Sequence, residues 1–172
     1  MEIKRITLGN QGLIIPNIGL GCMGMTGFED GHMYGPADEQ EAIATIHRSL
    51  ELGGNFLDTA DLYGPFKNEQ LIAKAIANKR DQYIIATKFG WEIDDQNQVT
   101  WAINSKKDYV KKAVERSLKN LKTDFIDLYY MHRLDKNTPI EETVGAMSEL
   151  VKEGKIGYIG LSEVSSETVK RA

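Results

Sequence analysis

From residue 38 onwards, the sequence alternates regularly between amphipathic helical patterns and short apolar strand patterns. Strands that alternate with helices in this way are typical of a parallel sheet built from right-handed βαβ units. Including one apolar stretch before residue 38, the expected strands are residues 18–22, 55–60, 83–87, 125–131 and 156–161.

Each expected helix follows a residue that suits its amino end. Asp38 with Glu41 three residues later resembles a capping box, as does Ser105 with Asp108. The expected first residues or caps are Asp38, Asn68, Ser105, Thr138 with Pro139, and either Ser165 or Ser166. Glycines at 53, 54 and 154 end two of these helices.

The first 37 residues follow a different pattern. Ile6 and Leu8 precede the turn sequence 9–12, and apolar residues 13–15 follow it, so we expect a short hairpin that ends at Pro16. Residues 24–36 hold four glycines and a proline, which predicts an unusually long loop.

Two architectures fit this alternation, an open doubly wound sheet and a closed (β/α)8 TIM barrel. Residues 19–24 match the G-x-G-x-x-G pattern of the first, but the next helix does not begin until about Asp38, too late for that motif. The strand period of about 30 to 40 residues suits the barrel, because eight units would need about 300 residues. We therefore expect a single α/β domain over residues 1–172, an incomplete barrel with about five of eight units and an N-terminal hairpin.

Polar residues stand at the ends of the expected strands. Asp58, Lys88, His132 and Ser162 each close an apolar run, and Tyr63 follows Asp58 in the next loop. In a barrel, the carboxyl ends of all strands face one mouth, where active sites lie. Taken singly, each residue also has an ordinary structural explanation, but the ordered set favours a catalytic site.

These residue types would form a consistent proton-donating group. A lysine beside Tyr63 favours the phenolate, and Asp58 keeps that lysine charged and oriented. With His132 hydrogen-bonded to the same substrate oxygen, the group would polarise a carbonyl and protonate the resulting alkoxide. No side chain supplies hydride, so a nicotinamide cofactor is implied.

Four segments together resemble the aldo-keto reductase family: NFLDTADLYG (55–64), ATK (86–88), DLYYMH (127–132) and GLSE (160–163). The resemblance runs the length of the chain in the right order and implies a (β/α)8 barrel that reduces carbonyl compounds with NADP(H). It further implies a catalytic tetrad of Asp58, Tyr63, Lys88 and His132, with Tyr63 as the proton donor. The cofactor-binding positions that it implies are Gly21, Cys22, Met23, Asp58 and Ser162.

The resemblance leaves two other functions open. Members of the family are nearly twice this length. The chain is therefore expected to be the N-terminal portion of an enzyme, or an inactive fragment. In either case residues 156–161 are expected to form an exposed edge strand. The alternative is a non-catalytic nicotinamide-binding regulatory subunit, like the potassium-channel β subunits that share the fold.

Charge and composition limit the classes of binding partner that we expect. The net charge of −4 disfavours binding to nucleic acid or anionic membranes, although one helix carries seven lysines and arginines between residues 106 and 122. These lie opposite the apolar stripe, as on the outer surface of a barrel helix. One cysteine, and no signal or membrane segment, lead us to expect a cytoplasmic protein acting on a small-molecule carbonyl substrate.

Two further observations concern a pair of histidines and a pair of tryptophans. His32 and His47 lack metal-ligand spacing, so hydrogen bonds to solvent or to the loop are expected for both and no metal site is expected. Trp91 and Trp101 follow Lys88 and either line a substrate pocket or pack the loop.

Overall fold

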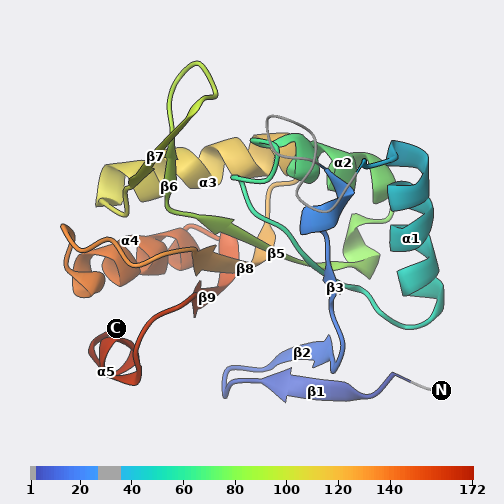
Figure 1. Cartoon of the computed structure of the whole chain (residues 1–172). Helices are drawn as coiled ribbons and strands as arrows, with labels where there is room; N and C mark the ends of the chain where they lie inside the picture. Colours follow the sequence, from blue (N-terminus) through green and yellow to red (C-terminus); the bar gives the residue numbers. More distant parts are fainter. Residues whose placement is uncertain (1–2, 27–35) are drawn as a thin grey trace.

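The computed structural model describes residues 3–26 and 36–172, and a parallel five-stranded sheet forms its centre. The strands, in spatial order, are β3 (Leu20–Gly21), β4 (Phe56–Asp58), β5 (Ile84–Phe89), β8 (Ile126–Met131) and β9 (Ile156–Leu161). This order follows the chain without reversal, whereas a doubly wound sheet reverses its order at a switch point. The fold is therefore the expected incomplete (β/α)8 barrel, with β9 at the edge of the sheet (Figure 1).

The helices cover one face of this sheet, as Figure 1 shows for α2 and α3. They are α1 (Glu39–Glu51), α2 (Lys67–Ala75), α3 (Lys107–Leu121) and α4 (Ile140–Lys152), followed by the short α5 (Ser166–Arg171). Alternate strand residues such as Leu57, Ile85 and Tyr129 pack against the apolar stripes of these helices in the largest buried cluster. The intervening residues face the opposite side of the sheet.

The predicted N-terminal hairpin is present and packs on that opposite side. Strands β1 (Arg5–Leu8) and β2 (Leu13–Pro16) pair antiparallel, and Figure 1 shows them below the sheet, away from α2 and α3. Leu13 and Ile15 pack against Ala86 and Leu128 in a second buried cluster. The expected long loop falls largely on residues 27–35, which lie outside the described residues, as does His32. Residues 23–25 form the 3-10 helix η1 (Met23–Met25).

Three of the predicted helix starts agree with the structure and two are wrong. Asp38 accepts a hydrogen bond from the Glu41 amide, and Ser165 accepts one from the Thr168 amide. Pro139, from the predicted pair Thr138 with Pro139, is the N-cap of α4 and makes no side-chain cap bond. The N-caps of α2 and α3 are Phe66 and Lys106 instead of Asn68 and Ser105. The side chains of Asn68, Ser105 and Thr138 bond to buried polar partners.

A second hairpin, not predicted from the sequence, follows β5. Strands β6 (Trp91–Ile93) and β7 (Val99–Ile103) pair antiparallel and rise from the carboxyl end of the sheet (Figure 1). Tyr109 of α3 holds its base, because the phenol accepts from the Ile93 amide at 2.8 Å and donates to the Trp91 carbonyl at 2.9 Å. Arg116 donates to the Ile93 carbonyl at 2.8 Å.

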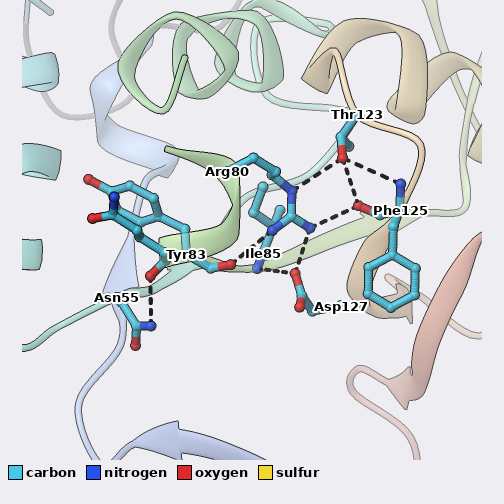
Figure 2. A network of polar contacts seen from close by, with 8 residues as sticks. Asn55, Arg80, Tyr83, Ile85, Thr123, Phe125 and Asp127 are labelled. Atoms are coloured by element: carbon cyan, nitrogen blue, oxygen red, sulfur yellow. Dashed lines mark hydrogen bonds and ion pairs between the residues drawn. The ribbon is translucent and has the colours of Figure 1, made fainter. Parts of the chain in front are cut away.

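A polar network ties β5 to β8 near the amino ends of the strands (Figure 2). The Asp127 carboxylate accepts hydrogen bonds from the Ile85 amide at 2.9 Å and from Arg80 at 2.7 Å. Arg80, in the 3-10 helix η2 (Arg80–Gln82), also donates to the Phe125 carbonyl at 2.8 Å. This network supports the register that places Lys88 opposite Tyr130.

Ion pairs reduce the basic character of the outer surface of α3. Lys107 and Lys111 contact Glu149 of α4 at 2.5 and 2.8 Å, and Lys112 contacts Asp95 at 2.5 Å. His47 bonds to a neighbouring helix instead of to the loop, since its Nε2 lies 2.6 Å from the Ala75 carbonyl of α2. Over residues 3–26 and 36–172 no helix has both the length and the apolar character to cross a membrane, and no metal-binding cluster is found.

Candidate active site

Backbone hydrogen bonds continue past the carboxyl ends of the strands and align the residues that follow them. The Thr59 amide donates to the Ala86 carbonyl, and the His132 amide donates to the Phe89 carbonyl, each at 2.8 Å. The Ser162 amide donates to the Met131 carbonyl at 2.9 Å. The residues that follow β4, β5, β8 and β9 therefore lie side by side at the carboxyl ends of the strands.

Lys88 is the most connected of these residues. Its ammonium donates to Oδ1 of Asp58 at 2.5 Å and to the Thr59 carbonyl at 2.8 Å, and it lies 3.5 Å from the phenol oxygen of Tyr63. The lysine is buried, with 9% of its surface exposed, so these contacts offset the loss of its hydration. The structure thus brings together the three residues expected from β4, its loop and β5.

His132 completes the group from the next strand. Its ring centroid lies 6.0 Å from that of Tyr63, and the two rings meet edge to face at 84°. Burial, and then the charges of Lys88 and Arg133, lower the pKa of His132 to about 4. The imidazole is therefore neutral near pH 7, and its buried Nδ1 has no hydrogen-bond partner within the described residues.

The predicted cofactor segment, residues 21–23, runs beside Asp58. Gly21 pairs with Asp58 in the sheet, and a Cβ at Gly21 would meet no atom of residues 3–26 and 36–172 within 4 Å, so these residues leave open space beside the backbone there. Met23 packs against the cluster formed by Ala60, Leu62 and Tyr63.

Cys22 turns its side chain into the core. The thiol is fully buried, and burial, followed by the charge of Asp58, raises its pKa to about 12. The Cys22 backbone remains close to the tetrad, because its amide donates to the Asp58 carbonyl at 2.8 Å. Any contact of this position with a ligand would therefore involve backbone atoms.

The two tryptophans lie together on the hairpin that follows β5. Their rings meet edge to face with centroids 5.9 Å apart, and Trp91 packs against the cluster containing Tyr63. Trp91 therefore borders the site, while Trp101 is more than half exposed.

A layer of buried polar residues lies behind the tetrad and was missed from the sequence. Asn68 and Glu69, in the first turn of α2, are fully buried, as are Asp61 and Thr87. One signal could have indicated Asn68: it lies three and four residues before Leu71 and Ile72, on the stripe that packs into the core. A polar residue at such a position needs buried partners.

Comparison with known proteins identifies the family of the chain. The model of the Aldo/keto reductase family matches residues 17–172. A curated relative, "Probable aldo-keto reductase 1" from Glycine max, is 44% identical over 172 residues, which are 99% of this chain and 48% of that protein.

Solved structures of similar sequence share the fold. The aldo-keto reductase AKR11C1 from Bacillus halodurans, in its holo form, superposes with a TM-score of 0.86 at 38% identity, over 99% of this chain and 55% of that one. An aldo-keto reductase from Klebsiella pneumoniae in complex with NADPH gives a TM-score of 0.74 at 30% identity, over 99% and 53% of the two chains. The chain spans about half the length of these relatives.

Proposed function

The chain belongs to the aldo/keto reductase family, and from this premise we propose that it carries the catalytic groups of an NADP(H)-dependent reductase. The reaction would convert an aldehyde or ketone to an alcohol, as in alcohol dehydrogenases of the carbonyl reductase type. One observation carries the proposal: a single buried ammonium, that of Lys88, contacts both the Asp58 carboxylate and the Tyr63 phenol. A small-molecule substrate and a cytoplasmic location are part of the same proposal.

Tyr63 is assigned as the proton donor. The positive charge of Lys88, 3.5 Å from the phenol oxygen, stabilises the phenolate that remains after the proton leaves. Asp58, 2.5 Å from the same ammonium, forms an ion pair with the lysine and holds it in place.

His132 is assigned to the substrate oxygen. A neutral imidazole donates one hydrogen bond without competing for the proton that Tyr63 supplies. A donor held in a water-poor site stabilises negative charge that develops on the carbonyl oxygen. The low pKa of His132 supports this role, since the ring stays neutral through the pH range in which enzymes usually work.

The residues present fit a nicotinamide. Open space adjoins the Gly21 backbone beside Asp58, and the Asp58 side chain is 36% exposed, so a flat ring could approach both. The residues that would hold the cofactor are Gly21, the backbone of Cys22, Met23, Asp58 and Ser162. When bound, the reduced nicotinamide would supply hydride to the carbonyl carbon. Trp91 and Met23 would form an apolar wall for the substrate.

Replacement of the proton donor tests the proposal. In Tyr63→Phe we expect NADPH oxidation with a panel of aldehydes and ketones to fall to background, while NADPH binding, followed by fluorescence, is retained. Tyr158→Phe is the matched control, because the Tyr158 phenol bonds to the Gln11 carbonyl of the hairpin turn and not to the tetrad. Unchanged turnover in Tyr63→Phe would refute the assignment. NADPH binding without turnover of any carbonyl by the unaltered chain would favour the regulatory-subunit alternative.

A further inference from the structure

Asn68 lies at the centre of the buried network behind the tetrad, and none of the proposed catalytic roles uses it. We propose that Asn68 is a positioning residue, whose amide holds in place the segments that carry Asp58, Tyr63 and Lys88. This inference rests on the proposed function for its catalytic meaning, but its structural content can be tested separately.

The oxygen of the amide supports the residue that holds the lysine. Oδ1 of Asn68 accepts a 2.7 Å hydrogen bond from the Thr59 hydroxyl, and both side chains are fully buried. Thr59 directly follows Asp58, and its carbonyl accepts the 2.8 Å hydrogen bond from the Lys88 ammonium. Movement of Thr59 would therefore shift two of the groups that fix that ammonium.

The nitrogen of the amide ties in the segment on the other side of Asp58. Nδ2 of Asn68 donates to the Cys22 carbonyl at 2.8 Å and to the Thr26 hydroxyl at 2.9 Å. The Cys22 amide in turn donates to the Asp58 carbonyl at 2.8 Å. Asn68 thus connects the end of β4, through the nearby Thr59, to the segment after β3, whose partners Cys22 and Thr26 are 46 and 42 residues away in the chain.

The backbone of Asn68 reaches the proton donor. Its amide donates a 3.1 Å hydrogen bond to the Tyr63 carbonyl. The preceding turn contains Phe66 in a left-handed conformation, with φ at 62°, which is unfavourable for a bulky residue. Such a conformation persists where the surrounding contacts determine it, and here the turn leads directly into the bond between Asn68 and Tyr63.

Few side chains could replace this amide. The Cys22 carbonyl oxygen can only accept a hydrogen bond. In Asn68→Asp a carboxylate oxygen would replace the Nδ2 donor, and the two oxygens would face each other in a buried site. Alanine would leave the Thr59 hydroxyl and the Cys22 carbonyl without this buried partner. Both changes should loosen the tetrad without removing any group that touches substrate.

The test compares Asn68→Ala and Asn68→Asp with Ile72→Ala. Ile72 is fully buried one turn later on α2 and packs in the core, so its truncation destabilises the helix packing while leaving the amide network intact. The first readout needs no cofactor: nitrogen NMR of the lysine ammonium groups measures the order of Lys88, assigned by its loss in Lys88→Met. We expect the order of this ammonium to fall in both Asn68 variants and to remain in Ile72→Ala.

The second readout is kinetic. For carbonyl reduction we expect kcat to fall by about 10²-fold in Asn68→Ala, because loss of alignment by about 1 Å costs this much. KM should change little, since Asn68 does not touch substrate, and Ile72→Ala should retain kcat at a temperature where it is folded.

Thr59→Val covers the case in which the Asn68 variants do not fold. Valine has the shape of threonine but lacks the hydroxyl that donates to Oδ1 of Asn68. This variant therefore removes the same hydrogen bond from the Thr59 side, and Lys88 should again lose order. Unchanged order of Lys88 in a folded Asn68 or Thr59 variant would overturn the inference. If Lys88 loses order as expected but the unaltered chain reduces no carbonyl, the positioning network stands and the proposed function fails.

Discussion

The hydroxyl of Thr87 donates a 2.7 Å hydrogen bond to Oε1 of Glu69, and both side chains are fully buried directly behind the tetrad. Burial raises the pKa of Glu69 to about 7. Asp61 is buried beside it, and burial, followed by the charge of Glu69, raises the pKa of Asp61 well above its ordinary range. The fold therefore holds two carboxyl groups that resist ionisation.

Glu69 makes stability fall as pH rises. Its pKa of about 7 in the folded chain exceeds the ordinary value of 4.5. The contribution of Glu69 to the free energy of unfolding is therefore fully present below pH 4.5 and is lost as pH rises from 4.5 to 7. The loss amounts to about 3 kcal/mol. In Glu69→Gln, which stays neutral and still accepts from Thr87, we expect the free energy of unfolding in urea to increase relative to the unaltered chain as pH rises from 4.5 to 7. Glu51→Gln, at an exposed position, is the control. An unaltered pH slope in Glu69→Gln would show that Glu69 ionises freely.

His132 has the opposite effect. Its folded pKa of about 4 lies below the ordinary 6.5, so on acidification the unfolded chain takes up a proton that the folded chain refuses. The contribution of His132 to the free energy of unfolding should therefore fall as pH decreases from 6.5 to 4. His132→Gln should remove this pH-dependent contribution. His47→Gln is the control, since His47 of α1 forms a hydrogen bond with the Ala75 carbonyl of α2, away from the tetrad. Because Glu69 and His132 oppose each other from pH 4.5 to 6.5, the unaltered chain should show a flatter profile than either variant.

Cys22 should be inert in the folded chain. The thiol is fully buried with its pKa raised to about 12, so the thiolate fraction near pH 8 is only about 10⁻⁴. We expect iodoacetamide to leave the native chain unlabelled and to add one label in denaturant, as Cys22 is the single cysteine. Gln96→Cys, in the exposed turn of the second hairpin, should label natively and shows that the reagent works. Rapid native labelling of Cys22 would mean that the end of β3 opens readily.

Asp58, Lys88 and His132 could be placed together from the sequence because each ends an apolar strand. Residues two apart share a face of a strand, and parallel strands present their carboxyl ends at one edge, so local pattern alone brings these side chains near each other. The contact of Lys88 with Asp58 and Tyr63 has the predicted partners. Cys22 shows the limit of this reasoning, since its position was predicted but the direction of its side chain was not.

The features that the sequence did not predict depend on partners far along the chain. Asn68 and Ser105 look like helix caps in a local window, but Asn68 bonds to the buried Cys22 carbonyl 46 residues away and Ser105 to Thr143 38 residues away. The hairpin of β6 and β7 likewise depends on Tyr109 and Arg116 of α3, which bind its first strand. Capping and turn signals describe the nearest few residues, whereas buried polar groups are satisfied wherever the tertiary fold brings a partner.

The network around Asp127 should stabilise the fold more than a surface ion pair of the same length (Figure 2). Arg80 and Asp127 are 2.7 Å apart and largely shielded, and the same carboxylate oxygen also accepts from the Ile85 amide. Arg48 and Glu51 are also 2.7 Å apart but mostly exposed on α1, where such pairs contribute about 0–1 kcal/mol. Hydrogen bonds to charged groups in shielded positions contribute about 1.5–3 kcal/mol.

Two double-mutant cycles measure the difference. One combines Arg80→Met with Asp127→Asn, the other Arg48→Met with Glu51→Gln, and urea unfolding gives the coupling free energy of each pair. We expect coupling of about 1.5–3 kcal/mol in the first cycle and below about 1 in the second. Asp127→Asn should also loosen the pairing of β5 with β8, seen as faster amide exchange at Ile85, because its charged acceptor is lost. Equal coupling in the two cycles would show that β5 and β8 keep their register through the strand ladder alone.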